Sequence, residues 1–125
     1  MLRLPRTSPV YAVARRLTSN FETDTADLLN QYVALMEAPS PLALDDLAAR
    51  WDAKLERVRT QFEREVPELV RLGNMQAGIC VNWRDFLRNY AEGLRTRNLD
   101  AINAGFAARE QAGLMRDRMR RYVPD

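Results

Sequence analysis

The sequence contains no histidine, one cysteine, one lysine and only short apolar runs. The commonest general base and the commonest transition-metal ligand are therefore missing, and the Glu-x-x-His pairs of ferritin-like di-metal sites are excluded. The lone Cys80 excludes an internal disulfide and suits a reducing compartment. No apolar run approaches the ~20 residues that span a bilayer. We therefore expect a cytoplasmic protein with no transmembrane segment.

Motifs for catalysis or cofactor binding are also missing. The sequence has no glycine-rich phosphate loop, no Gly-x-Ser-x-Gly elbow and no Cys-x-x-Cys pair. Glu63, Glu65 and Glu68 do not have the spacing of a calcium loop, and we interpret them as a solvated face. We expect no catalytic residue, no cofactor and no metal, and no small-molecule substrate is indicated. An enzyme or ligand sensor would need a deep pocket near Trp83 with convergent polar groups.

What the sequence does contain is typical of one helical domain. Its 125 residues are 46% hydrophobic and 29% charged, and a chain of this length buries about two thirds of its unfolded surface. The apolar mass is densest in 79–94, where spacings of three and four place several large residues on one side of a helix. These residues are Ile79, Trp83, Phe86, Tyr90 and Leu94. We interpret this strip as the centre of the core, with Trp51 as its packing partner.

The first helix is predicted from about residue 9 to 37. Ser8-Pro9 offers a capping hydroxyl followed by a proline at the first helical position. The segment 18–27 is rich in residues that prefer caps and turns, so two helices joined near 19–24 are an alternative. Pro39-Ser40-Pro41 ends the segment.

Three further helices are predicted. The second begins at Ser40-Pro41, or later near Asp45, and ends at Gly73-Asn74, with a kink or restart at Pro67. The third covers 75–96. Asn98 caps the fourth, which covers 99–122 and carries small residues such as Gly105 that allow a close helix neighbour. The expected fold is all-α, an antiparallel up-and-down four-helix bundle over 9–123, with a basic N-terminal arm over 1–8.

Charge is distributed unevenly along the chain, although the net charge is only +2. Residues 1–19 carry four arginines and no acid, residues 20–56 are strongly acidic, and the C-terminal part is basic. The acidic middle could serve packing within the chain or head-to-tail association. The arginines at the two ends could bind phosphate, an anionic surface or an acidic partner. They are Arg3, Arg6, Arg15, Arg16, Arg116, Arg118, Arg120 and Arg121.

Asn82 and Asn89 form a second candidate group, because two asparagines seven residues apart could fix the register of a helix seam or an interface. The leading functional prediction is a non-enzymatic interaction protein, working as a homo-oligomer or as a small accessory subunit of a larger assembly. The alternative is nucleic-acid binding through the arginine-rich terminal helices.

Overall fold

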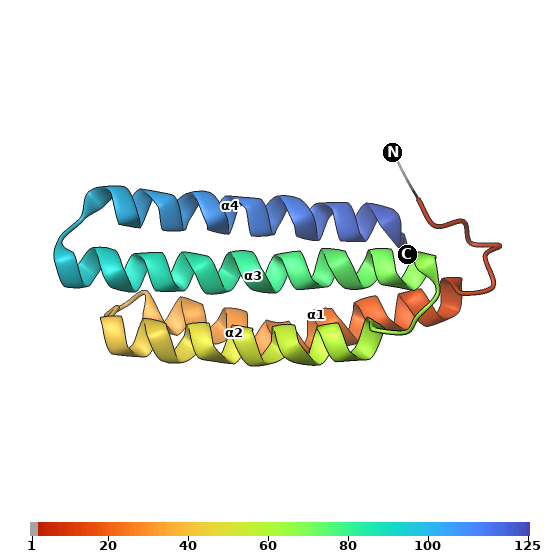
Figure 1. Cartoon of the computed structure of the whole chain (residues 1–125), viewed down its shortest axis with the longest axis horizontal. Coiled ribbons are helices and arrows are strands. Elements are labelled where there is room, and N and C mark those ends of the chain that lie inside the picture. Colours follow the sequence, from red (N-terminus) through yellow and green to blue (C-terminus); the bar gives the residue numbers. More distant parts are fainter. Residues whose placement is uncertain (1–2) are drawn as a thin grey trace.

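The computed structural model describes residues 3–125 as four antiparallel helices (Figure 1). They are α1 Tyr11–Leu35, α2 Pro41–Phe62, α3 Pro67–Thr96 and α4 Leu99–Tyr122. The predicted all-α four-helix bundle is confirmed. The first two residues of the predicted arm over 1–8 lie outside the described residues.

α1 is one continuous helix, so the alternative break near 19–24 does not occur. The Thr25 hydroxyl donates to the carbonyl of Phe21 at 2.8 Å, within the same helix. The predicted start at Ser8-Pro9 is two residues too early. The Ser8 hydroxyl accepts from the Val10 amide at 3.3 Å in a turn, and α1 begins at Tyr11 without a side-chain cap.

The second predicted helix is correct at its start, and the restart predicted at Pro67 is confirmed. The predicted end at Gly73-Asn74 and the predicted start of the third helix at residue 75 are wrong. The Ser40 hydroxyl accepts from the Ala43 amide and Pro41 is the first helical residue, as predicted. α2 ends at Phe62, and Val66 adopts an extended conformation before Pro67 starts α3. Because the residue before a proline avoids the helical region, the chain restarts here and continues unbroken through Gly73.

Gly73 serves packing and does not end a helix. A Cβ on this residue would lie 2.5 Å from Cγ of Phe62, far inside contact distance. The missing side chain thus lets the last residue of α2 pack directly on α3. Gly105 does the same between α4 and α3, where an added Cβ would lie 2.9 Å from the carbonyl oxygen of Phe86. The predicted close approach of α4 is confirmed.

The turn between α3 and α4 follows the predicted signals. Asn98 accepts from the amides of Asp100 and Ala101, and it caps α4. Arg97 takes the left-handed conformation, with φ of 53°, that ends α3. The two-residue link therefore holds α3 and α4 antiparallel and adjacent.

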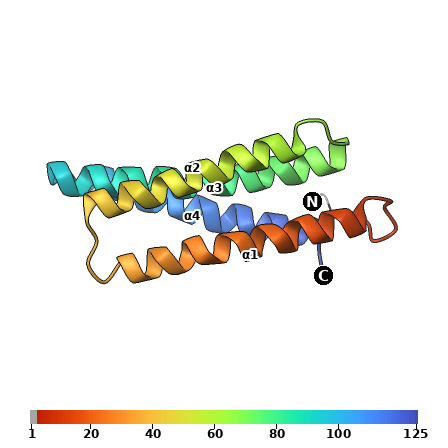
Figure 2. The ribbon, with the colours of Figure 1, turned by 90° about the horizontal axis from the view of Figure 1, so that it is seen from below.

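α3 is the central helix of the bundle. It packs along its length on α2 and α4, whereas α1 approaches α2 and α3 at few places and barely approaches α4 (Figures 1 and 2). Trp51 of α2 stacks on Trp83 of α3, with ring centroids 5.5 Å apart and planes 7° apart. This confirms the predicted partner of the aromatic strip. No helix within residues 3–125 is long and apolar enough to cross a membrane.

Candidate functional site

The first described residues and the C-terminus lie at one end of the bundle, called here the terminal end (Figure 1). Leu4 is buried there, and its amide donates to the carbonyl of Tyr122 at 2.8 Å. Arg15 pairs with the Asp125 carboxylate at 2.5 Å, and Arg6 donates to the Asp125 carbonyl. The structure therefore brings the N-terminal and C-terminal basic segments together, as the bundle topology predicts.

Acidic side chains of the same chain already pair with some of these predicted arginines. Arg120 pairs with Glu22 at 2.8 Å, and this hydrogen bond raises the pKa of Arg120. Arg16, Arg118 and Arg121 are exposed and make no ion pair within residues 3–125. Some of the predicted arginines thus make contacts within the bundle, and others are exposed without an ion pair.

The two remaining arginines of the group line hollows. Arg3 lies over a hollow of about 240 Å³ beside Pro67, Glu68 and Tyr122. Arg116 lines a different hollow, between α1 and α4.

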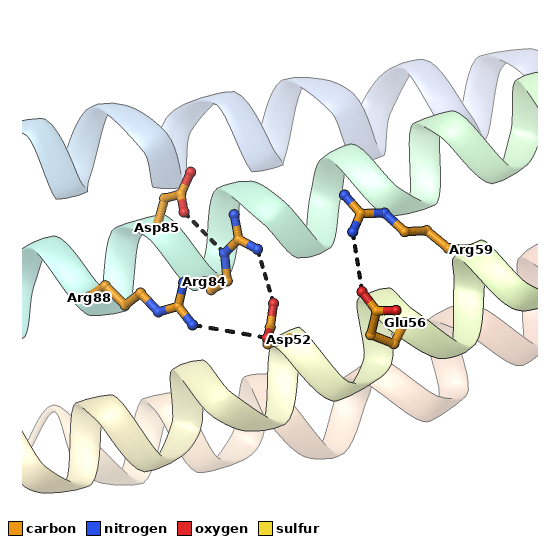
Figure 3. A network of polar contacts seen from close by, with 6 residues as sticks. All are labelled: Asp52, Glu56, Arg59, Arg84, Asp85 and Arg88. Carbon is orange, nitrogen blue, oxygen red and sulfur yellow. Dashed lines mark hydrogen bonds and ion pairs between the residues drawn. The ribbon is translucent and has the colours of Figure 1, made fainter.

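The acidic middle of the chain is used largely within the bundle. Figure 3 shows Asp52 of α2 facing Arg84 and Arg88 of α3. Arg84 Nη1 lies 2.9 Å from Asp52 Oδ1, and Arg84 Nε lies 3.1 Å from Asp85 Oδ1. Further pairs join α1 to α2 and α2 to α3: Lys54–Asp24 and Arg95–Asp45. The sequence allowed either packing within the chain or head-to-tail association, and packing within the chain accounts for these acids.

Asn82 and Asn89 lie half-buried on α3 near α4. The Asn82 amide donates to the carbonyl of Gly78 at 2.8 Å and lies 3.4 Å from the Met115 sulfur. A Cβ added to Gly105 would lie 3.3 Å from Cβ of Asn89. Both asparagines therefore border the seam within this chain.

An aromatic cluster with one arginine on it forms the middle of the molecule. The guanidinium of Arg109 lies 5.6–5.9 Å from the ring centres of Tyr32, Phe86 and Phe106. It also donates to the Tyr32 hydroxyl at 2.8 Å, which joins α4 to α1. Arg109 was not predicted from the sequence as a site residue, although its position three residues after Phe106 places both on nearby parts of one helix.

Three exposed apolar residues lie at the other end of the bundle, called here the link end because it holds the α1–α2 and α3–α4 links (Figure 1). Val33, Leu42 and Leu99 are 65%, 72% and 68% exposed, in the last turn of α1 and the first turns of α2 and α4. Phe106 and Leu114 are exposed further along α4. These residues were also missed, because in sequence they fit the ends of ordinary amphipathic helices.

Cys80 is fully buried, and this burial raises the pKa of its thiol to about 12. The group is therefore protonated at ordinary pH, and it lacks the thiolate that nucleophilic chemistry requires. Within residues 3–125, no three His, Cys, Asp or Glu side chains are grouped as metal ligands. Comparisons with protein families, curated proteins and solved structures find no match for this chain.

Proposed function

We propose that this chain is a non-enzymatic interaction protein of the cytoplasm, which works as a homo-oligomer or as a small accessory subunit of a larger assembly. The observation that carries the proposal is the exposure of Val33, Leu42 and Leu99 at the link end. Single exposed apolar residues are common on proteins. Three large aliphatic side chains at one end favour an interface, because an association that buried them would gain roughly 1–3 kcal/mol for each.

A second copy of the chain is a suitable partner for this end. The exposed charges beside the apolar residues include both Arg97 and Asp100, so two link ends can meet without a surplus of one charge. A stable interface buries about 800 Å² on each side. Phe106 and Leu114 are further exposed apolar residues along α4.

Light scattering after gel filtration tests this proposal. We expect a molar mass above that of the 14.4 kDa monomer, and we expect the double variant Leu42→Ser/Leu99→Ser to shift the mass toward the monomer. Val66→Ser is the matched control, since Val66 is an exposed aliphatic residue at the terminal end. A monomer at high concentration that also recovers no partner in a pull-down would reject the proposal.

Nucleic-acid binding is the second candidate, and the meeting of both basic segments at the terminal end favours it. The pairing of Arg15 and Arg120 with acids counts against it, because charges neutralised in the chain attract phosphate less. The same light-scattering experiment, repeated with an oligonucleotide at two salt concentrations, separates the two candidates. Binding through this end should weaken steeply with salt and weaken further in Arg118→Gln/Arg121→Gln.

A further inference from the structure

α1 and α4 enclose two adjacent hollows instead of a closed seam. The first, of about 170 Å³, has a mostly apolar lining that includes Phe21 of α1, Trp51, Trp83 and Met119 of α4. The second, of about 280 Å³, lies toward the terminal end and has a more polar lining that includes Arg15 and Thr18. Glu22 lines both, and its ion pair with Arg120 lies where they meet. We call the first hollow the α1–α4 cleft.

The cleft has an aromatic floor and an open mouth. Trp51 and Trp83, which are stacked on each other, line it together with Ile79. On α4 the cleft is lined by the buried Ala112 and by the exposed Gly113, which has no side chain and leaves the mouth clear. A Cβ added to Gly113 would meet no atom within 4 Å. An apolar group of modest size can therefore reach the partly buried Trp83, on which the fully buried Trp51 is stacked.

Arg109 and Arg116 line the cleft on either side of Gly113. Neither makes an ion pair with a carboxylate in the part of the chain that the structure describes. Arg109 donates to the Tyr32 hydroxyl and lies on three aromatic rings, which hold it in place while most of its N–H donors stay unused. The one acid on the cleft, Glu22, is already paired with Arg120. The local charge at the cleft is therefore positive.

Two buried polar atoms beside these hollows lack a partner. Trp51 Nε1 and Thr18 Oγ1 make no hydrogen bond, and their residues are 1% and 3% exposed. A buried polar group without a partner is unusual in a native protein. Trp51 lines the cleft and Thr18 lines the neighbouring hollow. The packing beside both hollows therefore leaves buried polar groups without a partner in the protein.

We propose that the α1–α4 cleft binds a small hydrophobic anion, with the apolar part of the ligand against Trp83 and its carboxylate at Arg109 and Arg116. The cleft volume of about 170 Å³ is too small for a larger partner. Pockets for drug-sized molecules are about 300–1,000 Å³, so the cleft alone suits a smaller ligand and has no room for a partner helix. This inference does not depend on self-association.

Intrinsic fluorescence gives a direct test, because both tryptophans of the chain lie on the floor of the cleft. The probe is octanoate, and octanol is the uncharged comparison. We expect octanoate to change the fluorescence saturably with one site per chain, and octanol to bind at least about tenfold more weakly, because a carboxylate held by arginine makes charge-assisted hydrogen bonds.

Variants on α4 separate the cleft from the rest of the surface. Arg116→Gln should weaken octanoate binding about tenfold, for the same loss of a charge-assisted contact. Arg118→Gln, an exposed arginine of the same helix outside the cleft, should leave binding unchanged. Gly113→Leu should block binding by filling the mouth while the helical circular dichroism is kept. Equal binding of octanol and octanoate, unchanged binding in Arg116→Gln, or no saturable binding at millimolar octanoate would overturn the proposal.

Discussion

Asp52 illustrates how single charged residues connect the helices. It lies on α2, and both Arg84 and Arg88 reach it from α3 (Figure 3). The hydrogen bond from Arg84 is the main cause that lowers the pKa of Asp52 below 3.8, against the opposing effect of burial. The contribution of this carboxylate to stability therefore depends on pH.

Replacing Asp52 by asparagine should reduce the loss of stability in acid. The folded-state pKa of Asp52 is depressed, so the unfolded chain binds the proton first as the pH falls. The stabilisation is present above the unfolded value near 3.8 and is lost as the pH falls through the lower folded value. Urea denaturation at neutral and acid pH should show a smaller difference for Asp52→Asn than for the natural chain.

Glu56→Gln is the control for this measurement. Glu56 pairs with Arg59 one turn further along α2, so this ion pair does not join two helices. The control should keep the pH dependence of the natural chain. An Asp52→Asn variant with that same dependence would show that the Asp52–Arg84 contact contributes nothing.

At the scale of the helices, the helix starts that depend on residues close in sequence were predictable. Ser40-Pro41 and Asn98 begin α2 and α4 because a capping side chain and its amide partners are neighbours in sequence. The end predicted at Gly73-Asn74 was wrong because the need for glycine there comes from Phe62, on the other helix of the pair. A glycine that favours a helix end and one that admits a neighbour look alike in sequence.

Alanine substitutions at Gly73 and Gly113 should therefore have opposite effects. Both residues lie inside helices, where alanine is favoured over glycine by about 1 kcal/mol. Gly113→Ala meets open space and should stabilise the protein by about 0.5–1 kcal/mol. Gly73→Ala forces the buried Phe62 ring to move and should destabilise it by about 1–3 kcal/mol. Chemical denaturation of both variants checks the signs, and a stabilised Gly73→Ala would contradict the packing role.

At the scale of the whole molecule, α1 is attached differently from the other three helices. Its buried side chains are small or polar apart from Phe21 and Leu28. Half-buried side chains such as Leu17, Leu29 and Tyr32 also pack against the core. Polar contacts add to this attachment: Arg120 to Glu22, Arg109 to Tyr32 and Lys54 to Asp24. The partly exposed Arg120–Glu22 pair contributes about 0–1 kcal/mol and is screened by salt, whereas the side chain of Lys54 is only 10% exposed.

Amide hydrogen exchange should therefore find α1 less protected than α3. We expect amides in the middle of α1 to exchange roughly tenfold faster or more than those of α3, because local opening requires fewer buried apolar contacts to break. Added salt should widen the difference, since it weakens the surface pairs and leaves the apolar core unaffected. Equal protection in all four helices would mean that α1 opens only with the whole bundle.

The candidate sites were less predictable than the fold. The basic residues at the chain ends were identifiable by composition, and the bundle topology correctly predicted that the two ends meet. Which arginines face acids was not predictable, because Glu22 and Arg120 are far apart in sequence. The role of Arg109 over the aromatic cluster depends in the same way on α1 and α3.

The sequential packing of α2, α3 and α4 has a consequence for how the chain folds. Each of these helices packs on its neighbour in sequence across a short link, so most backbone contacts of the core are local. Chains rich in local contacts fold fast, within about microseconds to milliseconds. The contacts of longest range join the first residues to the last, as between Leu4 and Tyr122. We therefore expect a rapid three-helix collapse, followed by docking of α1 and closure of the terminal end.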